Sequence, residues 1–274
     1  MEGQVKVITS KKTGSLGKTL SEVWAYRELL YFLVWKDVKI RYKQTVLGIA
    51  WAVLQPLIAM VIFWFIFGAV LNVQTDIPYP LFAYSGLVIW IYFSTALNQS
   101  SGSVLNNTNL LTKVYFPRIL LPLSACLVGV LDYVIATVML VVLMLFFGIM
   151  PSPWIFLLVI PFFTSVLLAS GIGFWVSSVS AKYRDVKYIT PFFVQLLLFV
   201  SPIIYPSTAI PPSLSWVLTI NPLTGIIEAQ RAFVLGTGIV DWVPLGISVA
   251  VSLALFLFGA FFFSRYERQM ADVI

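Results

Sequence analysis

Residues 13–19, TGSLGKT, end in the Gly-Lys-Thr triplet that closes a phosphate-binding loop. Such a loop has the form G-x-x-x-x-G-K-[ST], because its glycines let backbone amides surround the phosphates while the lysine and the hydroxyl reach phosphate and magnesium. The position of the first glycine is occupied by Lys12. Only one short apolar run precedes the triplet, so no parallel sheet is available to support a loop. We therefore predict no nucleotide site in this chain and interpret residues 1–18 as a basic polar tail.

The composition removes several other kinds of chemistry. The chain of 274 residues has no histidine and a single cysteine, Cys126, which excludes a Ser-His-Asp triad, a Cys/His zinc site and an intrachain disulfide. One carboxylate, Asp132, lies inside an apolar run. An ionisable group in a bilayer costs about 2.5 to 3.5 kcal/mol on insertion scales, so it normally faces protein or water and marks a functional candidate. A proton-coupled carrier would use a relay of several such groups, and we expect a structural or interfacial role for Asp132.

The elements that must position any functional group here are membrane helices. The chain is 60% hydrophobic and 10% charged, whereas an ordinary soluble domain has about 25% charged residues. Crossing a bilayer takes about 20 helical residues. We predict an all-α membrane protein whose transmembrane region covers residues 44–268, with a tail at 269–274 and a kink at Pro56. The six predicted spans are residues 46–71, 80–97, 119–147, 154–179, 189–205 and 243–263.

Two further segments are predicted to be helical without crossing the membrane. Residues 19–43 start with a capping box, T-L-S-E, and continue with aromatic and apolar side chains near one side and a basic end. This pattern is typical of an amphipathic helix that lies in the membrane interface, with a solvated surface helix as the alternative. Residues 206–241 hold apolar pieces that are too short and too interrupted by proline to cross. We interpret them as external re-entrant or interfacial helices between the fifth and sixth spans.

The positive charges test this topology. Cytoplasmic loops carry the excess of lysine and arginine. With both termini in the cytoplasm, all of the 17 lysine and arginine residues except Arg231 fall on the cytoplasmic side. If one span were missing, every later loop would lie on the opposite side of the membrane, and the positive charges would no longer gather on one side. The formal charge of +6 therefore indicates contact with membrane lipids rather than with nucleic acid.

Two cytoplasmic links suit the docking of a soluble partner, although ordinary positively charged loops would look similar. Residues 183–189 are short and carry charges of both signs, and residues 106–118 are long enough for a short helix parallel to the membrane. If ATP drives this protein, another chain must hydrolyse it.

Several separated motifs carry a resemblance to a known family. They are LVWKDVKIRYKQTVLGIAWAVLQPL at residues 33–57, LLTKVYFPRILLPL at 110–123, YRDVKYI at 183–189, SPIIYP at 201–206 and NPLTGIIEAQR at 221–231. In this order they resemble the permease subunit of bacterial ABC exporters of polysaccharides, of the O-antigen, capsule and teichoic-acid type. The resemblance extends from about residue 30 to residue 268, and the tail before Thr19 lies outside it.

The resemblance implies a half-transporter. Two copies of the chain would form a channel, and two copies of a separate ATPase, which holds ATP and magnesium, would bind below it. This chain would then be no enzyme and would bind no cofactor or metal. Arg184 and Asp185 match an R-D pair of the family and are our first choices for coupling. The full set expected to contact the ATPase is Leu110, Lys113, Tyr115, Arg184, Asp185 and Lys187.

Helical stripes supply candidates for the channel wall. Side chains at spacings of four and three share one face of a helix. Such stripes also suit lipid contact or helix packing, but the resemblance implies that the first and fifth spans line the channel, where aromatic surfaces would let the flat C–H faces of sugars slide. The candidates are Gln55, Phe63 and Phe67 in the first span and Tyr188, Phe192, Gln195 and Phe199 in the fifth.

The external segment supplies a candidate gate. Glu228 and Arg231 stand three residues apart and could pair on one helical face. The resemblance implies that this segment caps the channel exit.

We therefore predict a permease that moves lipid-linked polysaccharide across the bacterial inner membrane together with a partner ATPase. One alternative is an exporter of drugs or small lipids with the same architecture. A membrane-embedded enzyme that transfers sugars or lipids would need clustered carboxylates or metal ligands near one membrane face, and a proton-coupled carrier would transport without the ATPase.

Overall fold

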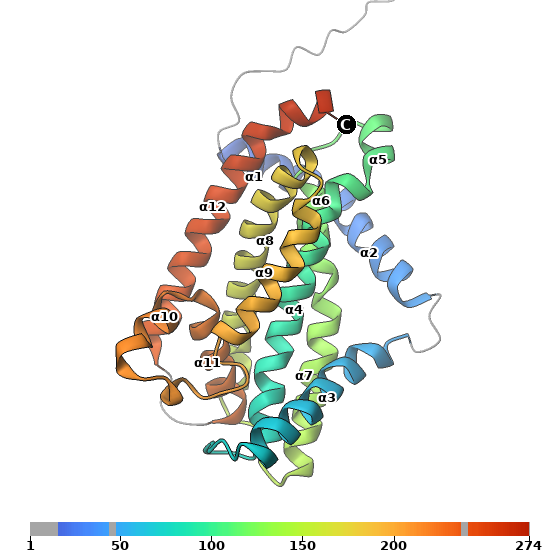
Figure 1. Ribbon diagram of the computed structural model, residues 1–274. Helices are drawn as coiled ribbons and strands as arrows, with labels where there is room; N and C mark the ends of the chain where they lie inside the picture. Colours follow the sequence, from blue (N-terminus) through green and yellow to red (C-terminus); the bar gives the residue numbers. More distant parts are fainter. Residues whose placement is uncertain (1–15, 44–47, 237–240, 274) are drawn as a thin grey trace, which may run out of the picture.

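The computed structural model describes residues 16–43, 48–236 and 241–273, and these form helices joined by turns and loops, with no strand among them (Figure 1). The predicted all-α class is confirmed. The helices before the centre of the chain are α1 (Leu16–Ala25), α2 (Arg27–Lys43), α3 (Ala50–Phe63), the π-helix η1 (Trp64–Val70), α4 (Tyr79–Asn106), α5 (Thr108–Lys113), α6 (Leu120–Val128) and α7 (Val130–Phe146). The later helices are η2 (Ile155–Leu158), α8 (Val159–Lys182), α9 (Val186–Val200), η3 (Ser207–Ala209), η4 (Pro212–Leu214), α10 (Ser215–Ile220), α11 (Pro222–Leu235) and α12 (Trp242–Val273).

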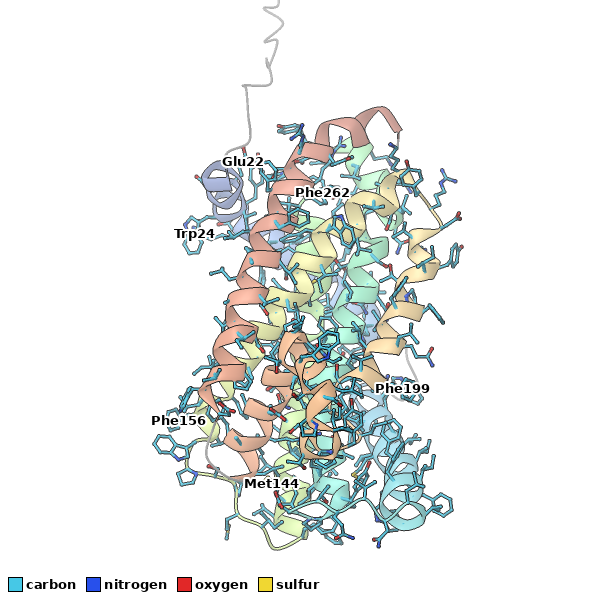
Figure 2. All side chains as sticks on the ribbon, turned by 60° about the vertical axis from the view of Figure 1, so that its left-hand side comes forward. Glu22, Trp24, Met144, Phe156, Phe199 and Phe262 are labelled. Carbon is cyan, nitrogen blue, oxygen red and sulfur yellow. The ribbon has the colours of Figure 1, made fainter. Side chains whose placement is uncertain are left out.

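The centre of the bundle is α4, which is mostly buried because α3, α6, α7, α8, α9 and α11 all pack against it. Figure 1 shows this arrangement, with α7 on one side of α4 and α8 and α9 on the other. The largest core cluster joins side chains of these helices, such as Phe93, Leu140, Leu168 and Ile227. The outer surface of the bundle also carries apolar side chains, and Figure 2 shows Trp24, Phe156 and Phe199 there. Apolar side chains on both sides of a helix are typical of a membrane protein.

Five helical segments are long and apolar enough to cross a membrane. They are Ala50–Val70, Tyr79–Asn106, Leu120–Phe146, Ile155–Lys182 and Trp242–Glu267, and they match five of the six predicted spans. The predicted fifth span, 189–205, does not correspond to a helix of this length, because α9 has only 15 residues, or about 22 Å of helix. It ends where Ser201 turns to extended backbone before Pro202, since the residue before a proline is pushed out of the helical region.

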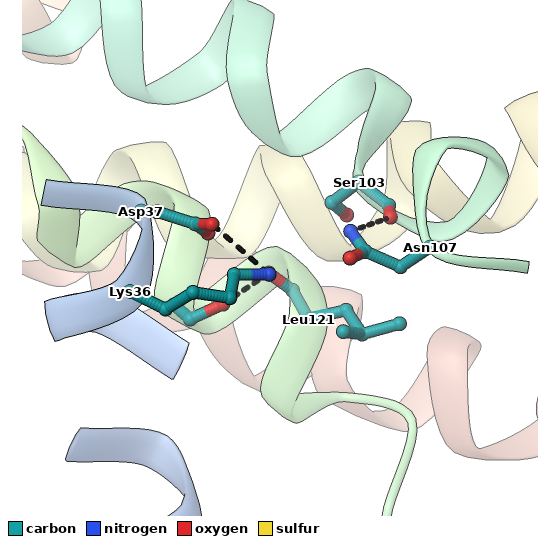
Figure 3. A network of polar contacts seen from close by, with 6 residues as sticks. Lys36, Asp37, Ser103, Asn107 and Leu121 are labelled. Atoms are coloured by element: carbon teal, nitrogen blue, oxygen red, sulfur yellow. Dashed lines mark hydrogen bonds and ion pairs between the residues drawn. The ribbon is translucent and has the colours of Figure 1, made fainter. Parts of the chain in front are cut away.

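The amphipathic segment also differs from its predicted bounds. Helix α1 begins at Leu16, so the T-L-S-E motif lies inside the helix, and a break at Tyr26 separates α1 from α2. Leu33 of α2 packs against Phe116, Leu120 and Leu121. Figure 3 shows Lys36 of α2 next to Leu121 of α6, with its ammonium nitrogen 3.1 Å from the Asp37 carboxylate. Helix α2 is therefore fixed to the bundle through α6.

The segment predicted as external and re-entrant contains η3, η4, α10 and α11, and its part from 237 to 240 lies outside the described residues. Helix α11 is largely buried against α4, α8 and α12. Asn221 caps it by accepting a hydrogen bond from the Leu223 amide at 3.0 Å, and Gly236 ends it with a left-handed backbone.

Helices α8 and α12 approach each other closely at two glycines. A Cβ atom at Gly259 of α12 would overlap the carbonyl oxygen of Gly171 in α8, and one at Gly171 would lie 2.5 Å from the Phe256 amide nitrogen. Small residues at such crossings let helix backbones pack directly in membranes, where helix contacts cannot rely on the hydrophobic effect.

We expect Gly259→Ala to lower the free energy of unfolding by about 1–3 kcal/mol or more, because the added methyl group meets backbone that cannot move aside. Cys126, which is fully buried, gives the measurement, since a thiol-reactive dye labels it only when the bundle opens. Gly246→Ala is the matched control in the same helix, because nothing lies within 4 Å of a Cβ atom there. Equal labelling of both variants would contradict the close crossing.

Candidate functional site

The two links predicted to contact a partner lie side by side at one end of the bundle. Figure 1 shows α5, the turn between α8 and α9 and the C-terminal part of α12 together at this end. The Lys187 ammonium group donates a hydrogen bond to Asn106 Oδ1 at 3.2 Å, which joins the start of α9 to the end of α4. The same end of α4 carries an internal bond, from the Asn107 side-chain amide to the Ser103 carbonyl at 2.8 Å (Figure 3).

The predicted contact residues divide into exposed and supporting ones. Tyr115 is 90% exposed in the extended chain after α5, and Lys113 is also exposed. Arg184 and Asp185 are exposed in the turn between α8 and α9. Leu110, by contrast, is half-buried and packs against the cluster around Leu33. The surface therefore offers an aromatic ring and charges of both signs, with Leu110 holding α5 in place from beneath.

Polar contacts fix the bases of both links to long helices. The Ser180 hydroxyl of α8 donates to the Ser101 carbonyl of α4 at 2.7 Å. The backbone amide of Arg118 donates to Glu267 Oε1 at 2.8 Å, and the guanidinium of Arg118 donates to the Glu267 carbonyl at 3.1 Å. A force on either link is therefore applied to α4 or α12.

The predicted stripe on α9 is open. Tyr188 is 76% exposed, and Phe192, Gln195 and Phe199 are exposed as well. The opposite side of the helix packs on α4 through Val194. An amide placed among aromatic rings on an outer helix face favours contact with another protein or with a polar ligand over contact with lipid alone.

The predicted stripe of the first span, which runs along α3 and η1, is largely engaged within the chain. Phe63 and Phe67 are half-buried, meet edge to face with ring centroids 6.1 Å apart, and pack against the cluster of Tyr79 and Phe82. Gln55 is exposed and lines a cavity between α3, α4 and α7.

Arg231 of α11 lies at the opposite end of α9 and clamps the turn that follows it. The guanidinium is buried and donates hydrogen bonds to the carbonyls of Pro202 at 2.6 Å and Ile203 at 2.7 Å. It also lies 3.7 Å from the ring centroid of Phe82. A fork of this shape suits two neighbouring acceptors, and the aromatic face adds a cation–π contact. Gly86 gives it room, since a Cβ atom there would lie 2.7 Å from Arg231 Nη2.

Residues 28–235 match the family model described as ABC-2 type transporter. The chain belongs to this family. It is 29% identical to an O-antigen export system permease protein RfbA of Klebsiella pneumoniae, over 90% of this chain and 95% of that protein. It is 26% identical to the RfbA protein of Myxococcus xanthus, over 94% of this chain and 99% of that protein. The polysialic acid transport protein KpsM of Escherichia coli is 26% identical over 86% of this chain and 92% of its own length.

The matched region of this ABC-2 chain begins in α2 and ends with α11. It therefore includes both links, the α9 stripe and the Arg231 clamp.

Three contacts near the clamp of this ABC-2 transporter were not predicted from the sequence. The Tyr79 hydroxyl donates to the Ile204 carbonyl at 2.6 Å. Gln230 is fully buried, donates from Nε2 to the Ser85 carbonyl at 3.0 Å and accepts from the Tyr133 hydroxyl at 3.1 Å. The available signal was the pair Gln230-Arg231 inside an apolar segment, because buried polar side chains must find partners.

Glu228 lies on the same helix as Arg231 but does not form the ion pair that their spacing suggested. Within residues 16–43, 48–236 and 241–273, the ion pairs are Lys36 with Asp37 and Arg41 with Asp132. Arg231 bonds to carbonyls instead of pairing with Glu228, which is half-buried. The described residues also hold no group of three or more His, Cys, Asp or Glu side chains that could bind a metal ion.

Proposed function

We propose that this ABC-2 chain is the permease subunit of an ATP-driven exporter that moves lipid-linked polysaccharide across the bacterial inner membrane. The observation that carries the proposal is similarity over nearly the whole chain to permeases named for O-antigen export in two organisms and to a protein named for polysialic acid transport. The glycan would be of the O-antigen, capsule or teichoic-acid type.

The proposed architecture has six spans, with α9 as a short fifth one that the turn at 201–206 extends. Helices α1 and α2 would lie in the cytoplasmic interface, and α10 and α11 would enter the membrane again from outside. The charges support this orientation, with both termini in the cytoplasm. Lys113, Arg118, Arg184 and Lys187 gather at the end of the bundle that holds the links, and Arg231 lies near the other end.

The proposed assembly contains two copies of this chain and two copies of an ATPase that binds ATP and magnesium. The exposed charges at the α8–α9 turn and Tyr115 would contact the ATPase. The open stripe of α9 would face the channel between the two permease copies. Aromatic rings beside Gln195 suit a sugar chain, because the rings cover apolar C–H faces and the amide bonds with hydroxyl groups.

Transport would need no covalent step in this chain. Closure of the ATPase dimer would move the links, and the bonds from Ser180 and Arg118 would carry this movement to α4 and α12. ATP would thereby shift the population between two arrangements of the channel, because the ATPase binds them with different affinity.

Reconstituted vesicles test this proposal. We expect ATP hydrolysis to respond to a lipid-linked glycan only when the chain and the ATPase encoded beside it are both present. Hydrolysis by this chain alone would contradict the half-transporter. Stimulation by small amphiphiles, and not by glycan, would favour the exporter of drugs or small lipids, while transport driven by a pH gradient in the isolated chain would establish a carrier.

A further inference from the structure

A cavity of about 500 Å³ lies on the core side of α3, between the start of this helix, the end of α2 and the facing sides of α4 and α7. This volume is within the range of sites that hold small molecules, about 300–1,000 Å³. The back wall consists of Val88 and Tyr92 from α4 and Tyr133 and Ala136 from α7, which all belong to the largest core cluster. The cavity is therefore closed behind by the core of the bundle.

The front of the cavity reaches the surface beside the first turns of α3. Trp51 and Gln55 stand one helical turn apart in its wall, and both are exposed. Gln55 is also part of the first-span stripe that is predicted to line the channel. A molecule that moves along this stripe would therefore meet the mouth of the cavity.

The cavity lies deep in the membrane region. Asp132 in its wall is near the middle of the 27-residue segment Leu120–Phe146. Figure 1 likewise shows the end of α2 and the start of α3 beside the middle of the bundle. Ionisable side chains at this depth normally face protein or a water-filled space, and they mark the path of a substrate.

The polar groups of the wall select the kind of ligand. Arg41 Nη1 lies 2.7 Å from Asp132 Oδ2, and this pairing explains how the carboxylate is tolerated in a membrane helix. The pair has no net charge, so it disfavours a charged ligand. The other carboxylate oxygen, Asp132 Oδ1, is buried without a hydrogen-bond partner among the described residues. A buried acceptor in this state favours a ligand that donates a hydrogen bond to it.

The aromatic side chains of the wall offer ring surface. The Tyr92 hydroxyl donates to the Cys126 carbonyl at 3.3 Å, and the Tyr133 hydroxyl donates to Gln230 Oε1 at 3.1 Å. Both hydroxyl groups are therefore engaged in the core, and the rings are left to contact a ligand. Trp51 adds an indole ring at the mouth. An uncharged ligand with hydroxyl groups and flat apolar faces suits this combination.

We propose that the cavity binds one uncharged terminal sugar unit of the exported glycan, an inference that rests on the proposed function. A hydroxyl group of the sugar would donate to Asp132 Oδ1, the Gln55 amide would bond with a second hydroxyl, and a C–H face would cover an aromatic ring. Because the core closes the back of the cavity, a unit with neighbours on both sides could not enter. The occupant is therefore a chain end or a branch.

Saturation-transfer NMR of the full-length chain tests this site. The probes are the methyl glycosides of glucose, galactose and mannose and of the three matching uronic acids, in a detergent without a sugar headgroup. We expect at least one neutral glycoside to bind, with a dissociation constant about tenfold lower than that of its uronic acid. The uronate carboxylate would have to be desolvated while Arg41 is already paired. Binding of no neutral glycoside, or equal binding of its uronic acid, would overturn the proposal.

A linear trisaccharide of the sugar that binds tests the terminal position. Saturation should reach the protons of an end ring and leave the middle ring with a weaker signal. Equal signals from all three rings would contradict a cavity that is closed behind.

Three variants separate binding in the cavity from contact with other aromatic surfaces. Ala52→Phe fills the cavity without changing a charge and should abolish the signal. Trp51→Ala removes the ring at the mouth and should weaken binding roughly two- to tenfold. Trp64→Ala is the matched control, because Trp64 is an exposed tryptophan of the same apolar segment outside the cavity wall. It should leave binding unchanged.

The labelling of Cys126 shows whether each variant remains folded. If Ala52→Phe opens the bundle, Trp51→Ala and the comparison of probes on the unaltered chain still decide the question. Unchanged binding in folded Ala52→Phe, or equal binding by Trp51→Ala and Trp64→Ala, would overturn the sugar site. The vesicle experiment keeps this result separate from the proposed function. If the complex responds to glycan but no glycoside binds to the chain, the cavity site alone is wrong, whereas failure of both tests would overturn both.

Discussion

Replacing Arg231 by alanine is expected to lower the free energy of unfolding by roughly 2–6 kcal/mol. The buried carbonyls of Pro202 and Ile203 would lose their donors, and each unsatisfied buried group costs about 1–3 kcal/mol. The cation–π contact with Phe82 would be lost as well. Denaturant titration of the chain in detergent, with unfolding detected by the labelling of Cys126, measures this change as a lower denaturant concentration at the midpoint.

Two substitutions show whether the loss comes from the fork of the guanidinium. Arg231→Lys keeps the charge but offers a compact ammonium group, which cannot place two parallel donors in the same way, so an intermediate loss is expected. Glu228→Gln is the control on the same helix, because Glu228 makes no ion pair with Arg231. Its effect should be smaller than that of Arg231→Lys, because all the hydrogen bonds of the guanidinium are kept. An unchanged midpoint in Arg231→Ala would show that the clamp adds no stability.

Gly86→Ala probes the same clamp from α4. The added methyl group would lie 2.7 Å from Arg231 Nη2, so the guanidinium must leave its position and give up the bond to Ile203. Because both substitutions break one set of contacts, their effects should not add in the double variant. Additive losses would mean that Gly86 acts through some other contact.

Hydropathy was sufficient to predict the all-α class and five long spans, because the thickness of a bilayer sets the length of an apolar helix. It failed to predict the extent of α9. The apolar run continues to Tyr205, but the helix ends at Val200, since backbone geometry at Ser201 and Pro202 outweighs hydrophobicity there. Residues 201–206 form turns, and Arg231 satisfies two of their carbonyls.

Periodicity placed side chains on helix faces but could not say what each face contacts. Phe63 and Phe192 belong to similar stripes, yet the first packs inside the chain and the second is open. Periodicity also could not identify the partners of charged residues. Arg231 stood out as the one positive charge on the outer side, and Asp132 as the one carboxylate in a span. Their partners lie 28 or more residues away in sequence, and only packing brings them together.

The second large effect is expected at the turn between α8 and α9 and concerns transport rather than stability. Removing the side chains of Arg184 and Asp185 should reduce glycan export at least tenfold while the labelling of Cys126 stays unchanged. Both side chains are exposed, and Asp185 makes no capping hydrogen bond to α9, so folding loses little. Truncating one partner of a charge pair that is buried and hydrogen-bonded across an interface costs about 2–5 kcal/mol of partner binding, which is more than enough for a tenfold change.

The measurement compares export and ATP hydrolysis by the complex with the ATPase in vesicles. Asp76→Asn is the matched control for Asp185→Asn, because Asp76 lies in the loop before α4 at the other end of the bundle. If coupling passes through the turn, export falls in Asp185→Asn and not in Asp76→Asn, and ATP hydrolysis by the Asp185→Asn complex no longer responds to glycan. Lys187 gives a further distinction, because its bond to Asn106 joins the turn to α4. Lys187→Met should therefore weaken coupling while the ATPase stays bound, whereas normal export in the Arg184 and Asp185 variants would remove this turn from the coupling path.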